Sequence, residues 1–262
     1  MLAPSNRSRP GTPERFRLRN RTTEVAVAAF LGLVLLLTGC SPSSSDQPDP
    51  SSPGGAGAVT EKEPPDPNAG LKNGTQLKKA LLTKADLPAG YKVAKDYVRD
   101  SAEVWGDKSK PTTPTKADCK HIDTNVWVNG AGIGSAAFAQ TAYTNGYGNE
   151  IDAEIDAYRG RDAAKVMTNL RKLFSVCATY NTTTPGVGRT KVKVTRKVGP
   201  KLGDSSVKAL ATSKDWADGA TLIAVQVDTS VVTILYSSST PASQLKAQKL
   251  TQLMVKRLSA KG

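Results

Sequence analysis

The chain has 262 residues and a formal net charge of +13, with 38% hydrophobic and 5% aromatic residues. This length and apolar content suffice for one folded domain with a core of ordinary size. The chain holds a single histidine, which excludes a histidine-rich metal site.

The first forty residues have the pattern of a bacterial export signal. Alternating arginines from Arg15 to Arg21 precede an uncharged run from Val25 to Leu37. That run is shorter than the roughly 20 residues that a membrane-spanning helix needs, and it fits the apolar part of a signal peptide. It leads into the lipobox Leu37-Thr38-Gly39-Cys40, so residues 1–39 are predicted to be a lipoprotein signal peptide and Cys40 the lipidated N-terminus. An ordinary signal peptide, or a short anchor with a chance cysteine, is the alternative.

Lipidation at Cys40 predicts attachment to the outer face of the cell membrane. Acyl chains such as palmitate contribute about 0.8 kcal/mol for each buried methylene. Residues 40–70 are rich in proline, serine and glycine and have almost nothing to bury, so a disordered tether with a reach of about 30 Å is predicted. The folded domain, residues 71–262, is therefore expected to stand off the membrane.

The sequence of the first half of the domain predicts short helices and strands around one pair of strands. A polar loop is expected over residues 105–116 and an ambiguous helical stretch over residues 117–128. The turn Asn145–Asn149 joins the two strands of the pair. The other predicted elements are a short helix at 76–82 and strands at 92–98, 134–143 and 151–158.

The strand predicted at 151–158 alternates apolar and acidic residues. Its apolar positions are Ile151, Ala153, Ile155 and Ala157, and the intervening ones are Asp152, Glu154, Asp156 and Tyr158. Such alternation buries one face of a strand and leaves the other in water. The acidic residues, with Glu150, are therefore expected to form a solvated face. A calcium site is disfavoured because they do not converge in a binding loop.

The sequence of the second half of the domain predicts two longer helices and four strands. A helix at 163–177 is capped by Asp162, and a final helix begins at Pro241 after the cap Thr240. Strands are predicted at 191–198, with a lysine-rich exposed face, and at 205–213. Residues 221–227 and 231–236 predict a central hairpin covered on both sides. The final helix is expected to bury Leu245, Leu250, Leu253, Met254 and Leu258. These elements together predict a single α+β domain.

Two cysteines, Cys119 and Cys177, remain once Cys40 carries lipid. In an oxidising compartment they most simply form a disulfide. A redox or metal pair is the alternative, but the two residues lack a CxxC spacing and have one nearby histidine, His121.

The order of these features resembles the PknH-like extracellular sensor domain family. The resemblance covers about residues 77–258 and rests on Leu81-Leu82-Thr83-Lys84-Ala85-Asp86-Leu87-Pro88-Ala89-Gly90-Tyr91, Cys119, the strand pair, the helix with Cys177, Leu202-Gly203-Asp204, the hairpin and the last helix. It implies a twisted antiparallel sheet flanked by helices, with a cleft for an undefined extracellular ligand. Kinase-linked members of the family signal through an attached kinase. A sensor role for this chain would require a partner protein instead.

No catalytic residue, metal or cofactor is predicted. His121 is expected to be a packed or surface histidine, and no motif that activates a serine is present. Gly130, Gly132 and Gly134 precede a strand, whereas a phosphate-binding loop opens a helix, so a tight loop is expected there.

Aromatic residues near the glycine-rich turns, Trp127, Tyr143 and Tyr147, are candidate ligand-binding residues, with core or turn packing as the alternative. We therefore expect a lipid-anchored ligand-binding or sensor-like module without catalytic activity. Its expected partners are the membrane, through Cys40, and an unknown small extracellular ligand or envelope protein, but no nucleic acid. An envelope adaptor with a basic face is the first alternative. A hydrolase is the second, and a buried carboxylate pair with a raised pKa in a cleft would favour it.

The basic face of the adaptor alternative draws on two segments. Its residues are Lys191, Lys193, Arg196, Lys197 and Lys201, and on the last helix Lys246, Lys249, Lys256 and Arg257. Lysines that keep an edge strand or a helix surface soluble are the competing explanation.

Overall fold

The computed structural model describes residues 66, 68, 70–94, 97–105, 111–184 and 188–260. The predicted signal peptide and Cys40 lie outside these residues, as does nearly all of the predicted tether. None of the helices that the structure describes combines the length and apolar character needed to span a bilayer.

A large sheet with a few helices confirms the predicted α+β class. The sheet has the order β1-β3-β4-β9-β8-β7-β6-β5, with β2 also paired to β3, and all its described pairings are antiparallel. The strands are β1 (Lys92–Val93), β2 (Arg99–Asp100), β3 (Ala137–Thr144), β4 (Glu150–Ala157), β5 (Thr179–Thr184), β6 (Gly188–Lys197), β7 (Ser205–Thr212), β8 (Ala220–Val227) and β9 (Ser230–Tyr236). The helices are α1 (Gly74–Lys78), α2 (Asp162–Val176) and α3 (Pro241–Ser259), with 3-10 helices η1 (Lys84–Asp86), η2 (Lys116–His121) and η3 (Trp127–Ala131).

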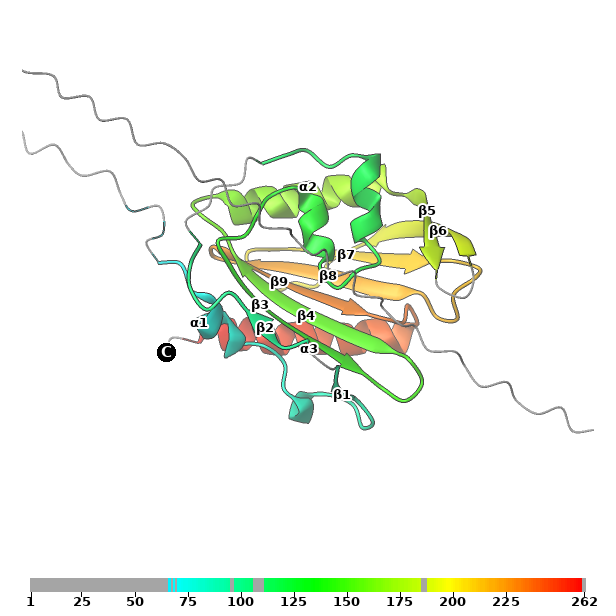
Figure 1. Cartoon of the computed structure of the whole chain (residues 1–262), viewed down its shortest axis with the longest axis horizontal. Helices are drawn as coiled ribbons and strands as arrows, with labels where there is room; N and C mark the ends of the chain where they lie inside the picture. The colour runs from blue at the N-terminus through cyan, green and yellow to red at the C-terminus, as the bar shows by residue number, and fades with distance from the viewer. Residues whose placement is uncertain are drawn as a thin grey trace, which may run out of the picture. The chain divides into compact units, whose positions relative to one another are not determined.

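Helices α2 and α3 cover opposite faces of the sheet (Figure 1). The apolar stripe of α2 packs on β6, β7 and β8, and that of α3 packs on β8 and β9. The hairpin β8–β9 is therefore covered on both sides, as predicted. Leu245 departs from the prediction because it lies off the buried stripe of α3 and is 62% exposed.

Several predicted boundaries shift in the structure. Among the described residues 92–94 and 97–98 of the predicted strand, only the two residues of β1 form a strand. The cap of α2 is Arg161, with Asp162 in the first turn. No element was predicted for β5. Its sequence, Thr-Tyr-Asn-Thr-Thr-Thr, has no hydrophobic alternation, although its β-branched threonines favour a strand.

Arg257 of α3 joins the last helix to the Leu-Pro-Ala-Gly-Tyr region near the start of the domain. Its two terminal nitrogens each lie 2.8 Å from a carboxylate oxygen of Asp86, and Nη1 also donates to the Leu81 carbonyl at 2.9 Å. Burial raises the pKa of Asp86, but hydrogen bonds from Arg257 and Thr83 outweigh this effect and hold that pKa below its usual value. Arg257 is therefore a structural residue rather than part of a free basic face.

We expect Arg257→Lys to lower the free energy of unfolding by roughly 1–3 kcal/mol, because one ammonium cannot replace a two-pronged contact with the carboxylate. Urea unfolding would measure this loss. Lys256→Ala, at an exposed neighbouring position, is the matched control and should leave the midpoint almost unchanged. A lysine variant as stable as the wild type would contradict the structural role.

Candidate ligand-binding cleft

A cleft of about 320 Å³ opens on the sheet face that α2 partly covers. Its floor is formed by Gln140 of β3 with Glu154 and Asp156 of β4. Glu154 pairs across the sheet with Thr233, and Asp156 with Val231, a residue of the core beneath α2. The main sheet contacts of α2 are with β6, β7 and β8, and the rest of the cleft lining includes Trp105 and, in and beside η3, Val126 and Asn129.

The acidic residues of β4 are buried, which corrects the prediction of a solvated face. Asp152, Glu154 and Asp156 are 8%, 5% and 2% exposed. Alternation along a strand shows which side chains share a face, and this part of the prediction holds because Ile151 and Ile155 pack on the α3 side. It does not show whether other segments cover the second face. Around Glu154 and Asp156, Trp105, Val126 and Asn129 line the same cleft and enclose this face.

Burial changes the acid–base properties of this row. Two effects raise the pKa of Asp152 to about 8: burial, which is the larger, and the nearby negative charge of Glu150. Burial also raises the pKa of Glu154 well above its usual range, reinforced by Asp156 and Asp152 and opposed by Arg99. The pKa of Asp156 is raised by burial as well, although a hydrogen bond from Ser135 opposes the shift. Burial therefore shifts all three carboxyl groups toward the protonated form, and a cation nearby would oppose that shift.

Two carboxylate oxygens on the cleft floor have unused hydrogen-bonding capacity. Glu154 Oε2 and Asp156 Oδ2 are buried and have no hydrogen-bond partner among the described residues. Native proteins pair nearly all of their buried polar atoms. Such oxygens at the floor of a cleft are therefore positioned to accept hydrogen bonds from a bound molecule.

Aromatic and amide side chains complete the walls of the cleft. Trp105 and Phe138 meet edge to face, with their ring centroids 5.4 Å apart, and Trp105 is 46% exposed. Asn129 of η3 and Ser135 add polar groups to the lining. A mixture of aromatic surface and a few convergent polar groups is typical of small-molecule sites.

The three aromatic residues predicted to bind ligand do not line this cleft. Trp127 is 1% exposed and stacks on Phe174 at 5.8 Å, while the hydroxyl of Tyr143 donates to the Leu82 carbonyl at 2.6 Å. Tyr147 is 88% exposed in the β3–β4 turn. Whether any of them contacts a ligand stays a prediction.

The cleft residues were missed because their side chains come from separated segments. Trp105, Asn129, Gln140 and Glu154 span fifty positions of sequence, and no local pattern links them. The available signal was the run of carboxylates on one face of a predicted strand, which is unusual for a strand of a folded core.

The glycine-rich segment differs in part from the predicted loop, because Gly130 lies within η3 and the tight turn comes at Gly132. Gly132 ends η3 with φ +69°, and a Cβ atom there would collide with Thr112 Oγ1. Its backbone role is therefore structural, since it lets residues 111–113 pack close to the end of η3.

A second hollow of about 460 Å³ lies between α2 and residues 111–113. Asn169 there donates to the carbonyls of Thr112 and Ala131, and Lys165 pairs with Asp162 at 2.7 Å. None of the buried side-chain atoms without a partner among the described residues belongs to this hollow. We therefore favour the first cleft as the functional site.

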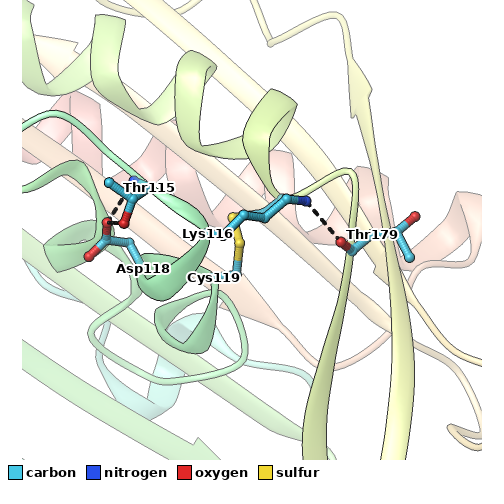
Figure 2. Close-up of a disulfide and its surroundings, with 6 residues drawn as sticks. Thr115, Lys116, Asp118, Cys119 and Thr179 are labelled. Carbon is cyan, nitrogen blue, oxygen red and sulfur yellow. Dashed lines mark hydrogen bonds between the residues drawn. A yellow bond between two sulfur atoms is a disulfide. The ribbon is translucent and has the colours of Figure 1, made fainter.

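The disulfide between Cys119 and Cys177 is present and confirms the predicted pairing (Figure 2). Cys177 caps the C-terminus of α2 and Cys119 lies in η2, so the bond fastens the η2–η3 wall of the cleft to the helix. Within the residues that the structure describes, no three histidine, cysteine, aspartate or glutamate side chains are grouped to hold a metal ion.

Comparisons with known proteins bear on the fold. No protein-family model matches the chain, and its sequence matches no curated protein. The crystal structure of the extracellular domain of PknH from Mycobacterium tuberculosis superposes with a TM-score of 0.52 at 14% identity, covering 73% of this chain and 98% of that domain. The chain has the PknH extracellular-domain fold. The resemblance to the PknH-like sensor domain is thus confirmed at the level of the fold.

An X-ray structure of an uncharacterised protein from Mycobacterium smegmatis, described as the Rv0999 ortholog, also matches. Its TM-score is 0.38 at 16% identity, with 70% of this chain and 97% of that one covered. The assignment of the PknH-like fold therefore rests on the PknH domain alone.

Proposed function

We propose that this chain is a lipid-anchored, ligand-binding module of the sensor type on the outer face of the cell membrane, without catalytic activity. The observation that carries the proposal is the cleft whose floor holds Glu154 and Asp156 with buried oxygens that lack partners among the described residues. The PknH-like fold and the lipobox ending at Cys40 support the location. A partner protein would pass the signal on.

Substituting Cys40 tests the anchor. In an exporting bacterial host fed an alkyne analogue of palmitate, we expect the wild-type chain to be labelled and to begin at residue 40 in intact mass spectrometry. Cys40→Ala should be unlabelled and keep its first 39 residues, because the thiol that accepts the diacylglyceryl group is gone. Ser43→Ala, close to the cleavage point, is the control and should behave as the wild type. Equal labelling of Cys40→Ala would contradict lipidation at this residue.

Ligand binding is tested by native mass spectrometry of the full chain, purified in mild detergent from the same host. We expect a retained small molecule that is lost on denaturation and weakened by Glu154→Gln. A bare chain that also gains no mass from a small-molecule extract of the envelope would contradict ligand binding.

An envelope adaptor is supported by one feature of the sheet. Lys191 and Lys193 of β6 are exposed on the face opposite α2, where α3 covers only β8 and β9. β6 is not an edge strand, since β5 lies outside it, so these lysines do not serve to protect an open edge. Binding of an anionic wall polymer by the wild-type chain tests this function. Loss of that binding when both lysines are replaced by alanine, with binding retained in Glu154→Gln, would favour the adaptor.

The buried carboxylates are also the feature that would favour a hydrolase. A catalytic acid and base have pKa values pushed apart, and in glycosidases they flank the scissile bond. Here Asp152, Glu154 and Asp156 lie side by side on one strand, and burial raises the pKa of each. This arrangement supports binding over catalysis. Turnover of p-nitrophenyl glycosides or esters that disappears in Glu154→Gln would contradict the proposal.

A further inference from the structure

The cleft floor carries two acidic groups that would be negatively charged when ionised. The ion pairs within 4 Å between described residues include neither Glu154 nor Asp156. In the strand register, Arg99 of β2 lies opposite Gln140 of β3, and Gln140 lies opposite Glu154 of β4. Arg99 is therefore separated from Glu154 by two strand spacings, about 10 Å. Its guanidinium group lies over the ring of Tyr97, 6.0 Å from the centroid. Arg99 lowers the pKa of Glu154, but its effect does not offset that of burial.

The unpartnered oxygens are concentrated in this cleft. Of the four buried side-chain atoms without a partner among the described residues, two are Glu154 Oε2 and Asp156 Oδ2 on the cleft floor. The others, on Thr141 and Tyr180, do not line it. A buried carboxylate oxygen without a hydrogen-bond partner is unfavourable, whereas a bound cation would supply both charge and donors.

We propose that this cleft binds a small organic cation of the ammonium, amidinium or guanidinium class, with its charged group on Glu154 and Asp156 and its apolar part against Trp105 and Phe138. The inference rests on the ligand-binding function proposed above and names the class of ligand.

The chemistry of the lining fits such a ligand. Planar amidinium and guanidinium groups donate two parallel hydrogen bonds to a carboxylate, and aromatic faces attract cations at close range. Side chains at alternate positions of a strand lie about 7 Å apart, a separation that a ligand with several donors can bridge. The volume of about 320 Å³ equals roughly ten water molecules at ~30 Å³ each, which suits a small molecule.

Charge neutralisation also predicts how binding depends on pH. The charged or titratable groups that act on Glu154 and Asp156 are Arg99 on β2, Asp152 on β4 and Tyr158 just after β4. The lining residues from β3 and η3 are uncharged. Because burial raises the pKa of both carboxyl groups, a cation must displace protons from them near neutral pH. We therefore expect the affinity to rise between about pH 5.5 and pH 8, with release of protons on binding.

The test compares benzamidine with benzamide, a neutral molecule of nearly the same shape. Isothermal titration of the full chain in mild detergent should show benzamidine binding at least about tenfold more tightly, since about 1.4 kcal/mol corresponds to tenfold. Glu154→Gln should lose about tenfold in benzamidine affinity by the same conversion. Glu150→Gln, on the same strand but outside the cleft lining, is the matched control and should bind as the wild type. NMR shifts of the Asn129 and Gln140 side-chain amides should place the probe in the cleft.

Two results would overturn the assignment of a cation. Equal affinities for the two probes, or benzamidine binding unchanged by Glu154→Gln, would show that charge does not select the ligand. If a neutral probe still shifts the amides of Asn129 and Gln140, the ligand-binding function stands without its cation. If neither probe shifts them and native mass spectrometry finds no retained molecule, both proposals fail.

Discussion

Replacing Cys119 and Cys177 together by alanine is expected to lower the free energy of unfolding by about 4 kcal/mol. The disulfide closes a loop of 58 residues, which restricts the unfolded chain strongly. Both cysteines are buried, at 2% and 0% exposure, so alanine removes the bond without adding a buried hydroxyl group.

The local structure explains why the cleft should suffer as well. Short 3-10 helices have little stability of their own. η2 is held to the end of α2 by the disulfide, and to the start of β5 by Lys116 Nζ, which donates to the Thr179 carbonyl at 3.2 Å (Figure 2). η3 is held by Trp127, which stacks on Phe174 of α2. Losing the bond should therefore loosen the wall that carries Asn129 and weaken ligand binding.

Urea unfolding of the wild type and the double variant, each with and without dithiothreitol, measures the effect. Reductant should destabilise the wild type to the level of the double variant and leave the double variant unchanged. A double variant with the wild-type midpoint would show that packing alone holds η2 and η3 in place.

The second large effect is a loss of stability as the pH rises. The carboxyl groups of Asp152, Glu154 and Asp156 have pKa values raised by burial, so the folded chain retains protons that the unfolded chain releases above about pH 4. Their stabilising contribution is complete below the unfolded pKa values and is lost as the pH rises through the folded ones. Unfolding free energy should therefore fall between about pH 5 and pH 8.

Asp152→Asn separates this effect from ligand binding, because Asp152 does not line the cleft. At about pH 8 we expect the variant to be more stable than the wild type by roughly 1–3 kcal/mol, since an amide has no charge to bury. At about pH 5 the two should differ little, because the carboxyl group is then protonated in the fold.

Glu103→Gln, at an exposed position, is the control and should keep the wild-type pH profile. Urea titrations across the pH range provide the measurement. An Asp152→Asn variant that follows the wild-type profile would show that this carboxyl group titrates normally.

Elements with strong local patterns were predictable. The stripe from Ala163 to Phe174 identified α2, and Thr240 followed by Pro241 identified the start of α3. The two apolar runs around Asp228 identified the β8–β9 hairpin, because only a strand pair covered on both faces is apolar on both. Weakly patterned elements such as β5 and the short β2 were not predicted, since their pairing depends on neighbours distant in sequence.

The candidate site was not predictable in the same way. The predicted aromatic residues, Trp127 and Tyr143, serve the core, and the carboxylates expected in water form the floor of the cleft. The local pattern placed Glu154 and Asp156 on the correct face of β4, opposite Ile155. Whether that face meets water depends on which segments fold over it.

By itself, the sequence determined the α+β class, the disulfide pairing and the faces of the main helices and strands, because these follow from residue spacing and cysteine number. The predicted signal peptide and the lipid anchor at Cys40 rest on the sequence alone. Only the tertiary structure decided that the acidic face of β4 is buried beneath η3 and Trp105. That burial requires contacts between segments far apart in the chain, and it converts solvated charges into a binding floor with raised pKa values.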